Sequence, residues 1–102
     1  MKTGIELIAQ ERKEQIEKHG RNIESDVEIN SCFQLSEAAC YLAWLDIEEA
    51  DCRDEAPCGW NLEQWQKMHD KPHEERLIIA GALIAAEIDR LNAIDDVLSN
   101  SK

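Results

Sequence analysis

The segment LIIAGALIAAEIDRLNAIDDVL, residues 77–98, decides the fold, because its apolar residues recur at the spacing of an α-helix. One stripe of this predicted helix carries Leu77, Ala80, Leu83, Ile84, Ile88, Leu91, Ile94 and Leu98. Glu87 falls within the same stripe, so its carboxylate should point into whatever this helix packs against. Burying an unpaired charge costs several kcal/mol. We therefore expect Glu87 to have a cation, a metal ion or several hydrogen-bond donors as its partner.

Length and charge limit the possible folds and functions. A chain of 102 residues suffices for one small domain, so we expect a single domain over residues 1–102 and an oligomer that enlarges its limited core. The net charge of −11 repels phosphate backbones and anionic membranes. We therefore expect no direct binding of nucleic acid and no membrane association. The acidity suits a chain that concentrates divalent cations, one that binds a basic partner protein, or simply a soluble surface.

The cysteines indicate the cellular compartment. They are Cys32, Cys40, Cys52 and Cys58. None of them forms a C-x-x-C pair, and no secretory segment precedes the first helical pattern. We therefore expect four reduced thiols and a cytoplasmic protein.

The whole chain shows helical patterns and no sustained strand alternation. Apolar periodicity predicts long helices over about 3–19, 31–51 and 73–98, and a short inserted helix over 61–69. Gly20 is typical of a helix end, and the polar residues 21–30 are expected to form a link. Asn61 precedes Gln64 at the spacing of a helix cap, and Pro72 favours the start of the last helix. The predicted fold is an all-α bundle of three long helices plus one short inserted helix.

A second charge lies on an apolar helix face. Arg12 lies between Ile8 and Ile16 on the side that the first helix should bury, and Gln15 lies beside it. The simplest inference is that Arg12 pairs with Glu87, or that both face one polar pocket. A buried ion pair would fix the helix register without any chemistry. In a pocket, Glu87 would bind a metal or substrate and Arg12 would bind an anion.

Other polar and aromatic residues are candidates for such a pocket. Glu37 and Gln34 lie on the more polar side of the second predicted helix, and Arg76 lies on the stripe of the last helix, about three turns before the acid. Trp65 could stack on a base. The sequence has no glycine-rich phosphate loop and no evident nucleophile with a His and an Asp partner. Phosphate chemistry here would therefore need carboxylates and a divalent cation.

Several stretches together resemble a known family. They are Glu11-Arg12-x-x-Gln15 followed by Gly20, an acidic link containing Asp26, the run Ala38-Ala39-Cys40-Tyr41, a Trp-containing insert, and Arg76-Leu77 followed by AGALIAAEIDRL. Over nearly the whole chain, and most specifically in residues 80–91, they resemble small phage and prophage proteins. These look like relatives of the MazG-like all-α nucleotide pyrophosphohydrolases, including the dATP/dGTP diphosphohydrolase type.

The resemblance implies a helical, oligomeric phage enzyme in the cytoplasm of a bacterial host. Such an enzyme binds Mg²⁺ through carboxylates on facing helices and cleaves a nucleoside triphosphate to a monophosphate and pyrophosphate. The residues that we expect to bind the metal are Glu11, Glu37 and Glu87, of which Glu37 and Glu87 would be catalytic. The residues that we expect to bind the nucleotide are Arg12, Gln15, Gln34, Trp65 and Arg76.

The acidic motifs differ in spacing from those of that family. Its hallmark is Glu-x-x-Glu followed, after a spacer, by Glu-x-x-Asp. Here Glu11-x-x-Glu14 and Glu48-x-x-Asp51 are present, but the spacer is long and Glu14 is expected to point to solvent. Two alternatives to an enzyme therefore stand beside it. One is a phage protein that sequesters a nucleotide signal without turnover, and the other is an acidic protein that inhibits a host defence protein.

Overall fold

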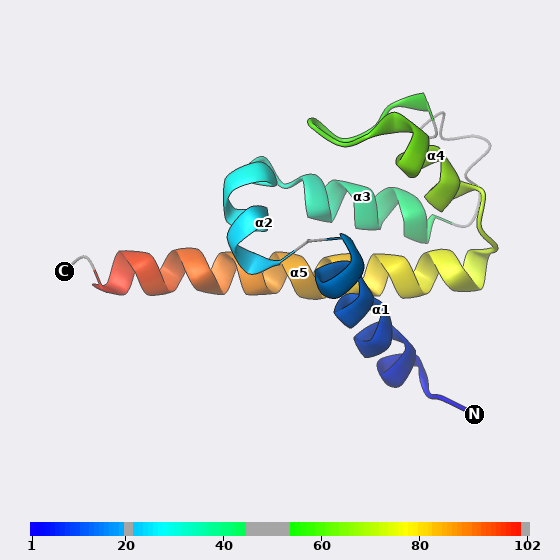
Figure 1. Cartoon of the computed structure of the whole chain (residues 1–102), viewed down its shortest axis with the longest axis horizontal. Helices are drawn as coiled ribbons and strands as arrows, with labels where there is room; N and C mark the ends of the chain where they lie inside the picture. The colour runs from blue at the N-terminus through cyan, green and yellow to red at the C-terminus, as the bar shows by residue number, and fades with distance from the viewer. Residues whose placement is uncertain (20–21, 45–53, 101–102) are drawn as a thin grey trace.

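A long C-terminal helix organises the fold. The computed structural model describes residues 1–19, 22–44 and 54–100, with the backbone alone at 19 and 96–100, and α5 runs from His73 to Asn100. The other helices are α1 (Gly4–His19), α2 (Ile23–Ile29), α3 (Gln34–Ala43) and α4 (Leu62–His69). α1, α2 and α3 each pack against α5 (Figure 1). Within the described ranges the chain contains helices and turns and no strand, so the all-α prediction is confirmed there.

Capping groups explain where three of the helices begin. At α1 the Thr3 hydroxyl accepts the Glu6 N–H and the Glu6 carboxylate accepts the Thr3 N–H, both at 3.2 Å, which is a capping box. At α4 the side-chain oxygen of Asn61 accepts the Gln64 N–H at 2.9 Å, as predicted. α5 begins directly after Pro72, also as predicted.

The segment predicted as a polar link contains a helix instead. Residues Ile23–Ile29 form α2, and the side chain of Asn22 caps it by accepting the Ser25 N–H at 2.8 Å. The predicted set of helices, which left residues 21–30 as a polar link, is therefore incomplete. This short helix has little apolar periodicity, and what it buries is the polar side chain of Asp26, so the hydrophobic pattern did not reveal it.

The second predicted helix is shorter than expected. α3 follows Phe33, whose φ of 64° is left-handed, and ends at Trp44, whose ψ of 128° is extended. Residues 45–51 of the predicted helix lie outside the described part of the chain. α5, against which α1, α2 and α3 all pack, occupies the centre of the bundle (Figure 1).

The hydrophobic core lies between α3, α4 and α5. Its buried apolar side chains are Leu35, Ala38, Ala39, Leu42, Trp65, Ile79, Ala80, Leu83 and Ala86. Trp65 is fully buried, with the Trp60 ring edge-on at 5.9 Å and the His69 ring at 4.2 Å between centroids. Large aromatic side chains dominate the energetics of cores. α4 is therefore held to the bundle mainly through Trp65.

α1 crosses α5 at a glycine. A Cβ atom on Gly81 would lie only 2.6 Å from Cδ1 of Ile8, so any larger residue here would force the Ile8 side chain to shift. The first turns of α1 project from the body, where Ile5 is 83% exposed, and the last turns of α5 extend beyond α2 (Figure 1). The molecule consequently measures 48 × 34 × 22 Å. None of its described helices has the length and apolar character required to span a membrane.

Candidate functional site

Glu87 is buried and fully paired inside the bundle. Its side chain is 8% exposed, and its two oxygens accept hydrogen bonds from Nε of Arg90 and, at 3.0 Å, from the hydroxyl of Ser36. The prediction that Glu87 is buried with a partner is confirmed. The partner is a cation of the same helix together with a hydroxyl of α3, so the pair connects the two helices.

The expected pairing of Arg12 with Glu87 is wrong. Arg12 is buried, as predicted, but its Nη2 donates to Oδ2 of Asp89 at 3.4 Å. Residues two positions apart on a helix point in directions about 200° apart. Asp89 therefore faces α1, whereas Glu87 faces α3. Arg12 and Glu87, the two charges that were expected to meet, lie on opposite sides of α5.

Arg90 is the centre of a charged cluster that the sequence did not reveal. The pKa of Arg90 is raised, first by the hydrogen bond to Glu87, against the opposing effect of burial, and further by the negative charges of Glu87 and Asp26. The Phe33 ring lies 5.5 Å from the guanidinium carbon. Asp26, Glu87 and Arg90 thus form a charged cluster that joins α2 to α5. The spacing of three residues between Glu87 and Arg90 was the available signal.

Gln34 binds backbone groups. Its side-chain nitrogen donates to the carbonyls of Ile29 at 3.1 Å and Cys58 at 3.3 Å, and its oxygen accepts the Cys32 N–H at 2.7 Å. The amide thereby links the end of α2, the start of α3 and the loop before α4. We assign Gln34 a structural role in place of the expected contact with substrate.

Arg76 is used in a similar way. It is buried, and it donates to the carbonyl oxygens of Lys71 at 3.1 Å and Trp44 at 3.2 Å. These bonds tie the end of α3 to the turn before α5. The guanidinium is therefore occupied by the backbone rather than presented to a phosphate.

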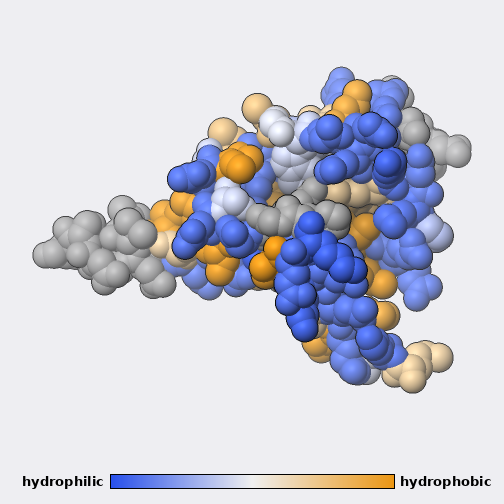
Figure 2. All heavy atoms as spheres, in the orientation of Figure 1, coloured by the Kyte–Doolittle hydropathy of each residue, from blue (hydrophilic) through white to orange (hydrophobic). Residues whose placement is uncertain are grey.

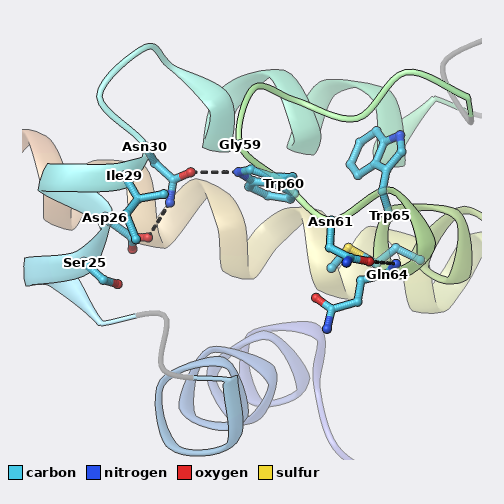
Figure 3. Close-up of a pocket in the computed structure, with 10 residues that line it drawn as sticks. Ser25, Asp26, Ile29, Asn30, Gly59, Trp60, Asn61, Gln64 and Trp65 are labelled. Carbon is cyan, nitrogen blue, oxygen red and sulfur yellow. Dashed lines mark hydrogen bonds between the residues drawn. The ribbon is translucent and has the colours of Figure 1, made fainter.

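A polar pocket opens between α2, α4 and the loop of residues 59–61 that precedes α4 (Figure 3). Its volume is about 220 Å³, and we call it the amide–indole pocket. Its lining residues are Ser25, Asp26, Ile29, Asn30, Gly59, Trp60, Asn61, Gln64, Trp65 and Met68. Most of the polar groups are neutral amides and a hydroxyl, with one carboxylate, and they surround a half-buried indole.

A hydrogen-bond chain fixes one wall of this pocket. The indole nitrogen of Trp60 donates to Oδ1 of Asn30, and Nδ2 of Asn30 donates to Oδ1 of the fully buried Asp26, each at 2.7 Å (Figure 3). On the opposite wall, the α4 cap uses only the oxygen of Asn61. Its NH₂ group and the Gln64 side chain make no hydrogen bond within the described residues, so both are available to a ligand.

A charged groove adjoins this pocket. It encloses about 430 Å³, and we call it the α1–α4 groove. Its lining residues are Glu11, Glu14, Gln15, Gln64, Lys67, Met68, Lys71 and Ile79. Gln64 and Met68 line both spaces, so the amide–indole pocket and the α1–α4 groove share one wall of α4.

The α1–α4 groove places acids and lysines opposite each other. Glu14 lines it and its side chain is 39% exposed, so it reaches solvent, as expected, along this groove. Nζ of Lys18, one turn on, lies 3.9 Å from its carboxylate. Across the groove, Lys67 and Lys71 form surface pairs with Glu63 and Glu75, at 3.5 and 4.0 Å. Such exposed pairs contribute little stability, so both ammonium groups can turn toward a ligand.

Gln15 adds a buried acceptor to the α1–α4 groove. The residue is 3% exposed and lines the groove, yet its side-chain oxygen has no hydrogen-bond partner in the described part of the chain. Leaving a buried acceptor without a donor costs about 1–3 kcal/mol. A ligand or a bound water that donates to this oxygen would remove that cost.

The three carboxylates predicted as metal ligands do not meet. Glu11 lines the α1–α4 groove, Glu37 is exposed in the first turn of α3, and Glu87 is inside the charged cluster. In the described ranges no group of three His, Cys, Asp or Glu side chains is placed to hold a metal ion. Glu48-x-x-Asp51 lies outside those ranges.

The aromatic residue at the pocket differs from the predicted one. Trp65 is at the rear of the amide–indole pocket, but its ring is fully buried in the core. Trp60 has the half-buried indole instead, and it follows Gly59, a turn residue with φ of 83°. Of the cysteines, Cys32, Cys40 and Cys58 are free thiols, as expected, and Cys52 is not among the described residues.

Comparisons with known proteins add no identity. No family model, curated protein or solved structure matches this chain. The function must therefore be argued from the amide–indole pocket and the α1–α4 groove.

Proposed function

We propose that this protein is a Mg²⁺-dependent nucleoside triphosphate pyrophosphohydrolase. In this proposal the base enters the amide–indole pocket and the triphosphate lies along the α1–α4 groove. The observation that supports it is the shared wall of Gln64 and Met68, which sets a neutral aromatic pocket beside a groove of carboxylates and lysines. A nucleotide likewise joins a neutral aromatic base to a charged triphosphate.

The amide–indole pocket suits a nucleobase. Indole rings provide flat apolar surface for a base, and Asn or Gln amides pair with the donor and acceptor atoms of base edges. Trp60 supplies the ring, while Asn61 and Gln64 supply amide groups. Ligand sites typically enclose about 300–1,000 Å³, a range that the two adjoining spaces reach together.

The α1–α4 groove suits a triphosphate bound with a cation. Lys67 and Lys71 provide two positive charges, but a net charge of −11 repels a polyphosphate. Mg²⁺ in nucleotide sites is usually held by one or two carboxylates together with substrate phosphates, and Glu11 and Glu14 line the groove together. Bound there, Mg²⁺ would supply charge neutralisation at the phosphates and a more acidic water.

Gln15 completes this set of groups. Its buried oxygen can accept a hydrogen bond from a water or from a donor of the nucleotide. The same residue was expected to bind substrate, and its unpaired oxygen beside the groove supports that role. Glu37 and Glu87 have no place in this proposal, because one is exposed elsewhere and the other is held by Arg90 and Ser36.

Pyrophosphate release tests the proposed activity. The wild type is incubated with Mg²⁺ and each of the common ribo- and deoxyribonucleoside triphosphates, in parallel with Glu14→Gln and Glu17→Gln. Glu17 is an exposed acid of the same helix, so Glu17→Gln is the matched control. We expect release from at least one nucleotide, a loss of about 100-fold in Glu14→Gln, and no change in Glu17→Gln.

Two results would contradict the enzyme proposal. One is the absence of pyrophosphate release from every nucleotide, and the other is full activity in Glu14→Gln. Binding without turnover is the second candidate function, and the positions of Glu11, Glu37 and Glu87 favour it, because the three predicted metal ligands lie in three different places. Calorimetry with nucleotide in the absence of Mg²⁺ distinguishes this sequestering function from the enzyme. Sequestration predicts nucleotide binding without Mg²⁺ and without turnover.

A further inference from the structure

The side-chain amide of Gln15 is buried without a hydrogen bond. Figure 2 shows mainly hydrophilic side chains over α1, and polar residues of such a helix normally face water. Gln15 is instead 3% exposed, and neither its oxygen nor its NH₂ group has a hydrogen-bond partner in the described part of the chain. Buried polar groups without partners are rare in native proteins, so this amide requires an explanation.

The spaces at the two ends of the α1–α4 groove show where Gln15 lies along it. At one end, Gln64 and Met68 are shared with the amide–indole pocket. At the other end, Glu11 and Lys71 are shared with a cavity of about 290 Å³ between α1 and the start of α5. Gln15 lies one helical turn after Glu11 and does not line that cavity. It therefore lies on the side of the groove toward the amide–indole pocket.

In the proposed binding mode this is the position of the sugar. The base occupies the amide–indole pocket, and the phosphates extend along the groove toward Glu11 and Lys71. The sugar that joins them then lies beside Gln64 and Met68, the wall that the two spaces share. The role of Gln15 that follows from this position rests on the proposed nucleotide function.

A sugar hydroxyl matches the chemistry of the Gln15 amide. The amide oxygen needs a donor and the NH₂ group needs an acceptor, and a hydroxyl can be either. Ionised phosphate oxygens only accept, so they would leave the amide oxygen unpaired. Rotation about the last side-chain torsion, which is broad and about two-fold, turns the oxygen toward the groove. This rotation breaks no hydrogen bond within the described residues.

We propose that Gln15 accepts a hydrogen bond from the 3′-hydroxyl of the bound nucleotide and thereby selects nucleotides that carry this group. Ribo- and deoxyribonucleotides both have a 3′-hydroxyl, so the contact serves either class. A site built to hydrogen-bond a substrate hydroxyl rejects an analogue that lacks it, because the buried protein group is then left unpaired. Here that group is the Gln15 oxygen.

Affinities for matched analogues test this contact. Calorimetry with Mg²⁺ compares non-hydrolysable ribo-, 2′-deoxy- and 2′,3′-dideoxynucleoside triphosphates of the same base. We expect the wild type to bind the 2′-deoxy form about 10-fold more tightly than the dideoxy form, and Gln15→Met to bind the two equally. Gln10→Met is the matched control, because Gln10 is an exposed glutamine of α1 that does not line the groove. It should keep the 10-fold preference.

Three results would overturn the role of Gln15 while leaving nucleotide binding intact. They are equal wild-type affinities for the 2′-deoxy and dideoxy forms, a preference that survives in Gln15→Met, and a preference that depends on the 2′-hydroxyl alone. The absence of binding by every analogue would instead reject the nucleotide function together with this contact.

Stability without nucleotide distinguishes a ligand-binding glutamine from a structural one. Replacing an unpaired buried amide by an apolar side chain of similar length removes a desolvation cost. We therefore expect the urea midpoint of Gln15→Met to be equal to or higher than that of the wild type. A lower midpoint, or a variant that does not fold, would show that Gln15 supports the fold and would reject the proposal.

Discussion

Glu87 shows how a buried charge can be structural. Its carboxylate bridges Arg90 and Ser36, and removing it leaves the Arg90 guanidinium buried without its direct partner. Breaking a buried pair in this way costs about 3–5 kcal/mol. We therefore expect Glu87→Ala to lower the free energy of unfolding by about 3 kcal/mol in urea denaturation.

Asp89→Ala is the control for Glu87→Ala, because Asp89 also pairs with an arginine but is 43% exposed. Arg12 is buried, but Asp89 is half-exposed and the pair is long at 3.4 Å, so we expect Asp89→Ala to cost less than Glu87→Ala, about 1–2 kcal/mol. Equal losses in the two variants would contradict the distinction between a fully buried pair and a half-exposed one. A Glu87→Ala protein that keeps its stability but loses activity would instead restore the catalytic role that the sequence suggested.

Helical periodicity correctly predicted that Arg12, Gln15 and Glu87 are buried, since it shows which face of a helix each residue occupies. It did not predict their partners. Whether Glu87 meets Arg12 or Arg90 depends on how α1 and α3 are placed around α5, and this is set by packing between helices. A local sequence pattern carries no information about where neighbouring helices lie around α5.

The crossing of α1 and α5 depends on Gly81. Alanine is the better helix former by about 1 kcal/mol, but its Cβ would displace Ile8. We expect Gly81→Ala to stabilise the protein by about 1 kcal/mol in an Ile8→Ala background and to lose that gain, or to destabilise, when Ile8 is present. Thermal unfolding of the wild type, the two single variants and the double variant measures the interaction energy between positions 8 and 81. An equal effect in both backgrounds would contradict the close approach.

The helices that sequence reasoning placed well are those with local signals. α1, α4 and α5 have a capping group or a proline at the start and continue with apolar periodicity. α2 was missed because its cap, Asn22, lies in a polar stretch and its buried residue is an acid. The end of α3 at Trp44 was missed because helical residue types continue beyond it and the break is a tertiary feature.

The assembled fold brings together groups that the sequence keeps far apart. Glu11 and Gln15 of α1 share the α1–α4 groove with Lys67 and Lys71, more than fifty residues later in the chain. Sequence reasoning selected Glu11 and Gln15 as candidates but chose Trp65 instead of Trp60 for the base. Burial depends on the fold, and Trp65 is the tryptophan that packs against the core.

The most direct test of nucleotide binding in this groove is the indole signal of Trp60 in a ¹H–¹⁵N spectrum, assigned with Trp60→Phe. The protein is titrated with Mg²⁺ and non-hydrolysable nucleoside triphosphate analogues. The indole proton of Trp60 bonds to Asn30 in the pocket wall, whereas Trp44 is exposed outside the pocket and serves as the internal control. We expect a saturable shift of Trp60 with Trp44 unchanged. A Trp60 signal that stays fixed with every analogue would contradict nucleotide binding here.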